Sequence, residues 1–351
     1  MSRRRNLGVA ALVTGVAGAA VAAGINAERR AVGRARSAAD PYVDEPFGKL
    51  HTEGLSVVAD DGVALHVEID GNPDSPLTVV FMHGFTLSMD AFHFQRRDLG
   101  DAARLVFYDQ RSHGSSERSP AEHCTIDQLG KDLDTVLQAV APAGPVVLVG
   151  HSMGGMTILS LADQRPDLFG DRIAGVALLS TSTGNVAKEI VGVPGAVSRL
   201  VSPFVPAGAK LVQRRAATIE RGRRVGSDVG FLFTRFISYG PGVPPSLVAF
   251  MEQMVSATPI EVMSQFFDTF LSHDKLTALD VLKDLPVLIS CGSKDVLTPL
   301  SHSQVMADAL PAAEFQVLPG ANHMAKLERH DDVNAALRRL FDRASERAAI
   351  R

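Results

Sequence analysis

The sequence Val149-Gly150-His151-Ser152-Met153-Gly154-Gly155 joins an apolar run, which we expect to be a strand, to a segment that we expect to be a helix. A Gly-x-Ser-x-Gly motif at such a junction is typical of a nucleophile elbow, a tight turn that exposes the serine hydroxyl. Side chains two residues before and after Ser152 would collide in this turn, which accounts for Gly150 and Gly154. The alternative is a glycine-rich turn whose serine only caps the helix. The expected strand and helix on the required sides favour the elbow.

Two downstream residues are suited to complete a catalytic triad with Ser152. A serine hydroxyl becomes a nucleophile when a base takes its proton, and the base needs a carboxylate that orients it and stabilises its charge. Asp295 follows the expected strand Val287–Ser290, and His323 follows the expected strand Glu314–Leu318. The order serine, aspartate, histidine is the one used by enzymes with this elbow. Each residue alone would more simply be a turn aspartate or a loop histidine, but their joint spacing predicts the triad.

The same chemistry requires donors for the negative charge that develops on a carbonyl oxygen. The segment His83-Gly84-Phe85 ends another expected strand, and a backbone N–H there can act together with one at the elbow. We therefore predict an oxyanion hole formed by the amides of Phe85 and Met153. His83 is interpreted as a support of this loop and not as a second base.

The rest of the chain alternates between strand-like and helix-like segments. Two runs around Asp60-Asp61-Gly62 predict an antiparallel hairpin. Later runs are continuously apolar, as in strands buried on both faces, and helical spacing separates them. This pattern predicts an α/β fold with a mostly parallel, doubly wound sheet. The expected later strands are Leu77–Met82, Arg104–Tyr108, Val146–Val149, Ile173–Leu179, Val287–Ser290 and Glu314–Leu318.

Residues 184–275 interrupt this alternation and divide the core into residues 46–183 and 276–351. The interruption carries eight of the seventeen phenylalanines and is broken by prolines, which indicates short helices. One interpretation is a helical insert that packs only on itself and the core. The other is a cap or lid, with some aromatic side chains lining an apolar pocket over the active site. We expect a cap, without assigning any single phenylalanine to the substrate.

Residues 1–45 are expected to be an amino-terminal signal or anchor segment and a linker. Residues 7–25 are uncharged and flanked by arginines, but they are rich in alanine and glycine. A signal anchor, a cleaved signal and a soluble helix all remain open. We favour a membrane-associated or exported protein over a cytoplasmic one.

Composition excludes several function classes. The 351 residues include 35 basic and 39 acidic side chains, and the basic ones are concentrated at the amino terminus, so the body of the chain does not suit nucleic-acid binding. The two cysteines provide no disulfide framework, and neither has the neighbours of a metal site. The oligomeric state is not indicated.

The chain resembles the α/β-hydrolase superfamily of serine esterases and lipases. The resemblance implies a carboxylic-ester hydrolase that works through an acyl-enzyme on a small-molecule or lipid ester, with no cofactor and no metal. Ser112 departs from the family pattern, which usually has glycine there. The segments that carry the resemblance are His83–Phe85, Tyr108–Ser116, Gly150–Gly154, Gly292–Asp295 and Gly320–His323.

Other activities share this fold. Cofactor-free haloperoxidase or perhydrolase chemistry, carbon–carbon bond hydrolysis and acyl transfer use the same triad, and a non-catalytic binding module is a further alternative. His93 and Asp98 match a pattern linked to acyltransferases in some relatives, although so short a pair also occurs on a solvated helix face. The apolar amino terminus and the phenylalanine-rich cap favour lipophilic acyl esters.

Overall fold

The structure is a computed structural model that describes residues 39–184, 235 and 238–350. Eight strands form one sheet in the order β1-β2-β4-β3-β5-β6-β7-β8. Strand β2 runs antiparallel to both of its neighbours, β1 and β4, and strands β3 to β8 are parallel to one another. The expected α/β fold with a mostly parallel sheet is confirmed. The strands are Gly54–Val58 (β1), Ala64–Gly71 (β2), Thr78–Met82 (β3), Arg104–Tyr108 (β4), Val146–His151 (β5), Ile173–Leu179 (β6), Val287–Gly292 (β7) and Glu314–Leu318 (β8).

The hairpin forms where the sequence predicts it. Its turn places Gly62 at a φ of 90°, a conformation that glycine adopts without steric cost. Strand β2 then pairs with β4 and leads the chain into the parallel sheet.

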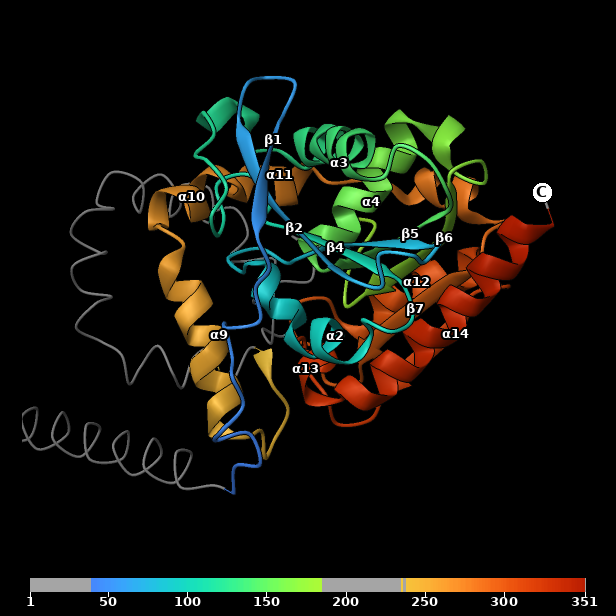
Figure 1. The fold of residues 1–351 in the computed structure, drawn as a ribbon. Coiled ribbons are helices and arrows are strands. Elements are labelled where there is room, and N and C mark those ends of the chain that lie inside the picture. The colour runs from blue at the N-terminus through green and yellow to red at the C-terminus, as the bar shows by residue number, and fades with distance from the viewer. Residues whose placement is uncertain (1–38, 185–234, 236–237, 351) are drawn as a thin grey trace, which may run out of the picture.

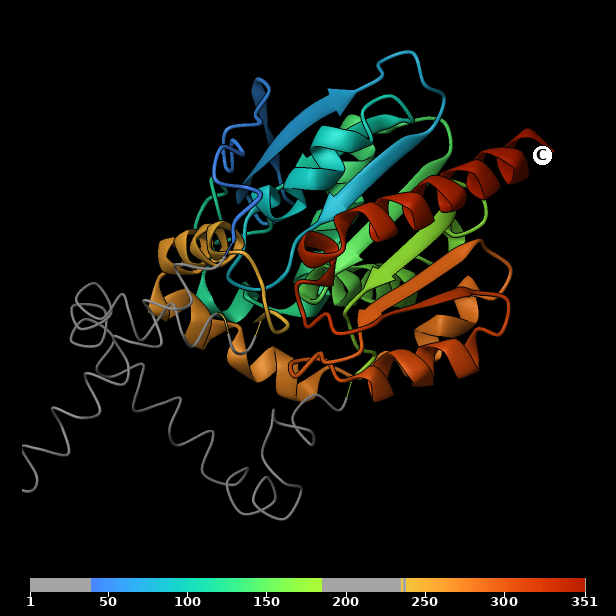
Figure 2. The same cartoon turned by 90° about the horizontal axis from the view of Figure 1, so that it is seen from below.

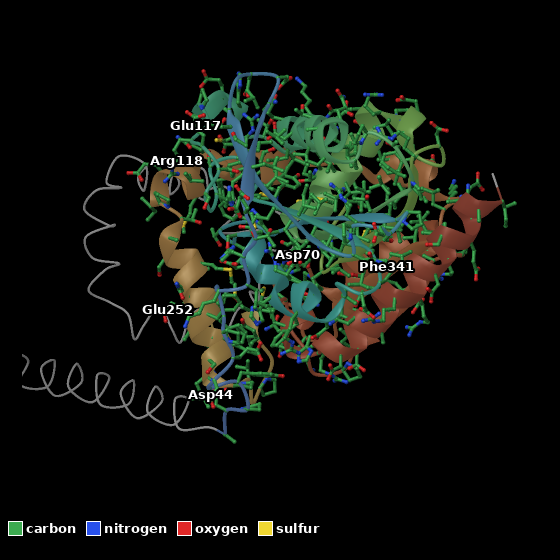
Figure 3. All side chains as sticks on the ribbon, in the orientation of Figure 1. Asp44, Asp70, Glu117, Arg118, Glu252 and Phe341 are labelled. Carbon is green, nitrogen blue, oxygen red and sulfur yellow. The ribbon has the colours of Figure 1, made fainter. Side chains whose placement is uncertain are left out.

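Helices cover both faces of the sheet (Figures 1 and 2). On one face, α3 (Ile126–Val140), α4 (Met153–Gln164) and α12 (Leu300–Ala309) pack on alternate strand residues. On the other face α14 (His330–Ala349) does so, and α2 (His93–Asp98) contacts the sheet through Arg96, whose guanidinium carbon lies 4.3 Å from the centroid of the Phe107 ring. Because both faces are buried, the central strands are apolar at most positions on both faces. Phe341 on α14 lies in the second of these layers, whereas Asp70 and Glu117 lie toward the molecular surface (Figure 3).

Short helices complete the chain. The 3₁₀ helices are Met89–Phe92 (η1), Ala121–His123 (η2), Pro166–Leu168 (η3) and Leu276–Leu282 (η6), and Ala325–Glu328 (α13) is a single α-helical turn between the loop that contains His323 and α14.

The described part of residues 184–275 is helical, as expected of a cap. It contains α9 (Pro245–Ala257), α10 (Ile260–Gln265) and α11 (Phe267–Ser272). Gly184 and Asp274 form an isolated antiparallel bridge, and Lys275 N donates a 2.7 Å hydrogen bond to Thr183 O. The segment therefore leaves and rejoins the core at adjacent positions. Much of the predicted cap, residues 185–234 and 236–237, lies outside the described residues.

Residues 40–51, which we call the strap, run alongside α9 (Figure 1). Asp40 accepts hydrogen bonds from the amide and hydroxyl of Ser246, and the ring of Phe47 stacks on that of Phe250 at 4.5 Å. The strap thus joins the cap to the core. None of the helices in the described ranges combines the length and apolar character needed to cross a bilayer, and the predicted signal or anchor at residues 7–25 lies outside those ranges.

Candidate active site

Ser152 occupies a strained turn between β5 and α4. Its φ is 54°, in the left-handed region that residues other than glycine rarely adopt. The two flanking glycines are needed for steric reasons. A Cβ atom on Gly150 would clash with the carbonyl of Gly154, whereas one on Gly154 would clash with the carbonyl of Met82 at the end of β3. The elbow is therefore packed against the neighbouring strand as well as closed on itself, which refines the collision expected from the sequence.

Asp295 and His323 lie in hydrogen-bond contact. They follow β7 and β8, and His323 Nδ1 is 2.9 Å from Asp295 Oδ2 and 3.1 Å from Oδ1. Oδ1 also accepts hydrogen bonds from the amides of Leu297 and Thr298, both at 2.9 Å. Burial raises the pKa of Asp295, but the charge and hydrogen bond of His323 and the hydrogen bonds from Thr298 outweigh it, so that the pKa is lowered overall. The carboxylate is thus held ionised behind the imidazole.

The histidine loop contacts the elbow through His151. His151 Nε2 lies 3.0 Å from the main-chain oxygen of His323, and the two imidazole centroids are 4.9 Å apart. Ser152 Oγ itself makes no hydrogen bond to another described residue. In serine hydrolases without substrate, the serine–histidine hydrogen bond is often long and tightens in the complex. The structure therefore places Asp295 in contact with His323 and brings the loop of His323 to the elbow. It does not show a hydrogen bond between His323 and Ser152 Oγ.

The loop after β3 approaches Ser152 closely. A Cβ atom on Gly84 would lie 3.2 Å from Ser152 Cβ, so only glycine fits without displacement. Thr86, at a φ of 62°, then turns the chain. Neither the amide of Phe85 nor that of Met153 has a hydrogen-bond acceptor among the described residues. Met153 is also the first residue of α4, where backbone N–H groups are free to bind an anion.

His83 supports this loop. Its Nε2 accepts a 2.9 Å hydrogen bond from Gln110 N, so Nδ1 carries the proton and donates to Gly84 O at 2.8 Å. Complete burial lowers the pKa of His83 to about 3, which keeps the imidazole neutral. These contacts agree with the supporting role expected from the sequence.

Ser112 adopts the backbone conformation that explains the family's usual glycine. Its φ is 64°, in the left-handed region. Its Oγ accepts a 2.9 Å hydrogen bond from Ser119 N, and its amide donates one of 3.0 Å to Glu117 O. The serine thus offsets backbone strain with a side-chain hydrogen bond that glycine could not make.

Aromatic side chains from the cap reach the predicted oxyanion loop. The rings of Phe85 and Phe270 meet edge to face with centroids 5.0 Å apart, and Phe266 lies 6.1 Å from Phe85. Met153 and Met156 on α4 belong to the same apolar cluster. We call these five side chains the apolar wall. Sequence periodicity alone could not single out Phe266 and Phe270 from the other aromatic residues of the cap.

Two residues of the candidate site had no role in the sequence interpretation. Thr298 Oγ1 donates a 2.9 Å hydrogen bond to Asp295 Oδ2. Asn322 Oδ1 accepts hydrogen bonds from Val296 N at 3.0 Å and from His323 N at 2.9 Å, and so ties the two loops together. Asn322 directly precedes the predicted base His323 in the sequence. This position is the only feature of the sequence that could have indicated a role for Asn322 in the site.

His93 and Asp98 form contacts away from the candidate active site. His93 Nε2 lies 2.8 Å from Glu45 Oε1 on the strap, and Asp98 pairs with Arg97 and Asn334. Among the described residues, neither side chain contacts Ser152, Asp295 or His323. His93 is buried, so the pair does not lie on the solvated helix face that was the alternative. Its contacts favour a structural role over the acyltransferase pattern.

Comparisons with known proteins agree with this architecture. A family model described as alpha/beta hydrolase fold matches residues 78–330. The sn-1-specific diacylglycerol lipase ABHD11 of Mus musculus is 25% identical over 275 residues, which cover 75% of this chain and 80% of that protein.

Two solved structures are also similar. A thermophilic esterase from Thermogutta terrifontis has a TM-score of 0.65 at 24% identity, covering 84% of this chain and 99% of that one. A bromoperoxidase from Bacillus anthracis has a TM-score of 0.63 at 21% identity, covering 82% and 99%. At these identities the two likenesses concern the fold alone.

Proposed function

The chain belongs to the alpha/beta hydrolase family of enzymes, and on that premise we propose that it hydrolyses carboxylic esters through Ser152, His323 and Asp295. The observation that carries the proposal is the contact between Asp295 and His323 on a loop that touches the strained elbow of Ser152. A buried carboxylate fixed by two amides and a hydroxyl is suited to orient an imidazole and to stabilise its charged form.

In the first half of the proposed reaction, Ser152 Oγ attacks the ester carbonyl carbon while His323 Nε2 takes the hydroxyl proton. The carbonyl π electrons move to oxygen, and the amides of Phe85 and Met153 donate hydrogen bonds to the resulting oxyanion. When the intermediate collapses, the carbon–oxygen bond to the alcohol breaks and His323 returns the proton to the leaving oxygen. The products are a free alcohol and an acyl-Ser152 ester.

Water completes the cycle. His323 takes a proton from water as its oxygen attacks the acyl carbon, and the same amides bind the second oxyanion. Breakdown of this intermediate releases the carboxylic acid, and the proton returns to Ser152 Oγ. Asp295 keeps its charge throughout and stabilises the imidazolium at each step.

The apolar wall supports a preference for lipophilic acyl groups. Its partly exposed members, Phe85 and Phe270, lie on and beside the loop that would bind the oxyanion, and the buried Met153, Met156 and Phe266 pack against them. Burial of each methylene of an acyl chain against such a surface contributes about 0.8 kcal/mol. The mouse relative's name, a diacylglycerol lipase, is compatible with this substrate class.

We propose further that residues 7–25 direct the enzyme to a membrane or out of the cytoplasm. The support is the arginine-flanked, uncharged sequence, and the strap that follows it packs on the core. Fractionation of cells that express the full chain tests this proposal. Recovery of the intact, unprocessed enzyme in the soluble cytoplasmic fraction would contradict it.

The test of the catalytic proposal is labelling of the full chain with a fluorophosphonate, together with hydrolysis of p-nitrophenyl esters from acetate to palmitate. The wild type should be labelled and should hydrolyse an ester. Ser152→Ala should fold like the wild type but should be neither labelled nor active. Ser345→Ala, on the distal part of α14, is the matched control and should behave like wild type. An active Ser152→Ala variant would refute the assignment, and labelling without ester hydrolysis would favour acyl transfer or carbon–carbon hydrolysis.

A further inference from the structure

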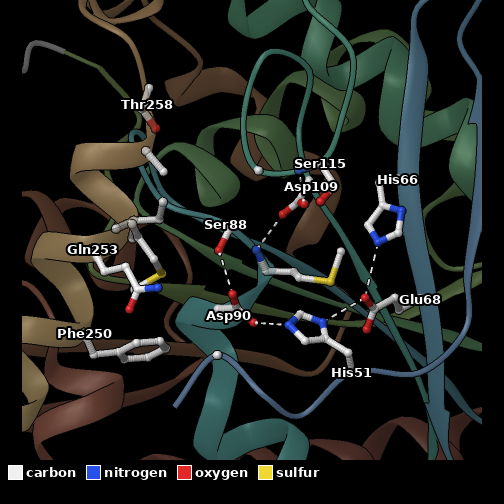
Figure 4. A pocket seen from close by; sticks show the side chains of 16 residues that line it. His51, His66, Glu68, Ser88, Asp90, Asp109, Ser115, Phe250, Gln253 and Thr258 are labelled. Carbon is white, nitrogen blue, oxygen red and sulfur yellow. Dashed lines mark hydrogen bonds and ion pairs between the residues drawn. The ribbon is translucent and has the colours of Figure 1, made fainter. Parts of the chain in front are cut away.

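The second pocket, named so to keep it apart from the candidate active site, has a volume of about 490 Å³ and lies between the strap, β2 and helix α9 (Figure 4). His66 and Glu68 line one side, and Phe250 and Gln253 line the opposite side. His51 and Asp90 lie between them. The described residues that line this pocket include neither Ser152 nor His323, so it is distinct from the candidate active site.

The pocket is rich in negative charge. Glu68 is balanced by Arg96, with which it forms a buried ion pair, and it also contacts His51 and His66. Asp90 has no such balance: its described contacts are Ser88 Oγ at 3.4 Å and His51 Nε2 at 3.3 Å. No lysine or arginine is among the described residues of the lining.

Asp109 is the second carboxylate of the lining that has no lysine or arginine partner among the described residues. Its two oxygens accept 2.7 Å hydrogen bonds from Met89 N and Ser115 N, and its side chain is 4% exposed. The imidazole of His83 lies near this carboxylate, with Nε2 3.9 Å from Asp109 Oδ1. Burial keeps that imidazole neutral, so it supplies no positive charge. Burial raises the pKa of Asp109 to about 6, so the group still ionises near neutral pH. The two amides satisfy this carboxylate only in part, because a buried charge is costly unless it is paired with an opposite charge as well as hydrogen-bonded.

The remaining lining is apolar. Phe250 and Met254 from α9 and Leu87 from the loop after β3 form this apolar part of the pocket lining. A bare metal ion would fill only a small part of the volume and would make no use of this apolar part of the lining. An organic cation suits both parts of the lining, because its charge faces the carboxylates while its carbon atoms face Leu87, Phe250 and Met254.

We propose that this pocket binds a small organic cation, with a quaternary ammonium group directed toward Asp90 and Asp109. The site is separate from the ester-hydrolysis proposal. Its binding can be measured without any ester, so failure of one proposal leaves the other unaffected.

The experiment is a calorimetric titration of the full chain with choline chloride at about pH 8, above the range in which histidine ordinarily titrates. Sodium chloride at equal ionic strength is the salt control. The uncharged isostere 3,3-dimethylbutan-1-ol has the same shape as choline without its charge. Saturable binding of choline, at least fivefold tighter than that of the isostere, is the expected result.

Two variants locate the binding. Asp90→Asn keeps the side-chain shape and should weaken choline binding about fivefold, the upper range for a partly exposed charge pair. Ala257→Leu, at an exposed lining position of α9, should obstruct the pocket and weaken binding without changing its charge. Asp308→Asn, on the exposed surface of α12, is the matched control and should bind like wild type.

Three outcomes would overturn the proposal. Equal affinity for choline and its isostere would show that the pocket recognises apolar bulk and not charge. Absence of choline binding to folded wild type would exclude the ligand class. Unchanged binding in both Asp90→Asn and Ala257→Leu would place the cation elsewhere. The comparison of choline with its isostere needs no variant, so the test stands even if a substitution impairs folding.

Discussion

Thr298 Oγ1 donates a 2.9 Å hydrogen bond to Asp295 Oδ2, the oxygen that lies closest to His323 Nδ1. Thr298 also supplies its own amide to the other carboxylate oxygen. A single residue therefore holds both oxygens of the proposed triad carboxylate, and it does so from outside the triad. We interpret Thr298 as a positioning residue for Asp295.

Thr298→Val should lower kcat for ester hydrolysis about tenfold, because a hydrogen bond to a charged group contributes about 1.5–3 kcal/mol. The hydroxyl is among the groups that lower the pKa of Asp295, so the acidic limb of the pH profile of kcat should also change. Thr298→Ser keeps the hydroxyl and should restore both properties. The pH profile distinguishes positioning from a general loss of stability. Wild-type kcat and an unshifted profile in Thr298→Val would contradict this role.

Much of the fold and the candidate triad could be predicted because strong local constraints determine them. Glycine is required at positions 150 and 154 because a Cβ atom there would clash with the backbone, and strands covered on both faces are apolar at most positions. Asp295 and His323 follow adjacent strands of the sheet, so the chain order alone indicated that they would lie together.

The contacts that could not be predicted depend on distant segments. Phe270 reaches Phe85, and Glu45 on the strap reaches His93, across sequence separations that carry no periodic signal. The same is true of the second pocket, because its lining comes from five segments that the sequence does not relate. The direction of a loop side chain such as Thr298 is likewise set by tertiary packing and not by local propensity.

Phe270→Ala should shift the preferred p-nitrophenyl ester toward longer acyl chains, provided that the proposed ester hydrolysis is correct. Loss of the ring opens space beside Phe85, on the apolar wall next to the predicted oxyanion donor. Each further methylene that the enlarged space accepts adds about 0.8 kcal/mol of binding. Phe267→Ala, on the same helix but outside the apolar wall, is the control. An unchanged chain-length profile of kcat/KM in Phe270→Ala would exclude this residue from the acyl site.

Ser112→Gly should be more stable to chemical denaturation than Ser112→Ala, by about 1 kcal/mol. Both variants lose the hydrogen bond from Ser119 N to Ser112 Oγ, so that contribution cancels between them. Only alanine keeps a Cβ atom at the φ of 64°. In an ordinary backbone conformation the order would be reversed, because glycine loses more conformational entropy on folding. Greater stability of the alanine variant would therefore argue against a left-handed conformation at this position.

Lys326→Met should stabilise the protein, most strongly near pH 7. Lys326 is 2% exposed, its Nζ contacts Met324 Sδ, and no carboxylate among the described residues pairs with it. Burial lowers its pKa from 10.5 to about 7. Between these values the unfolded chain holds a proton that the folded chain does not, so the wild type loses stability as the pH falls from 10.5 to about 7. The variant should gain on the order of a few kcal/mol at pH 7, and the gain should vanish toward pH 10.5. Urea unfolding of both proteins across this range measures the difference, with Lys283→Met, an exposed lysine, as the control. A gain that is independent of pH would mean that packing, and not the suppressed charge of Lys326, limits stability here.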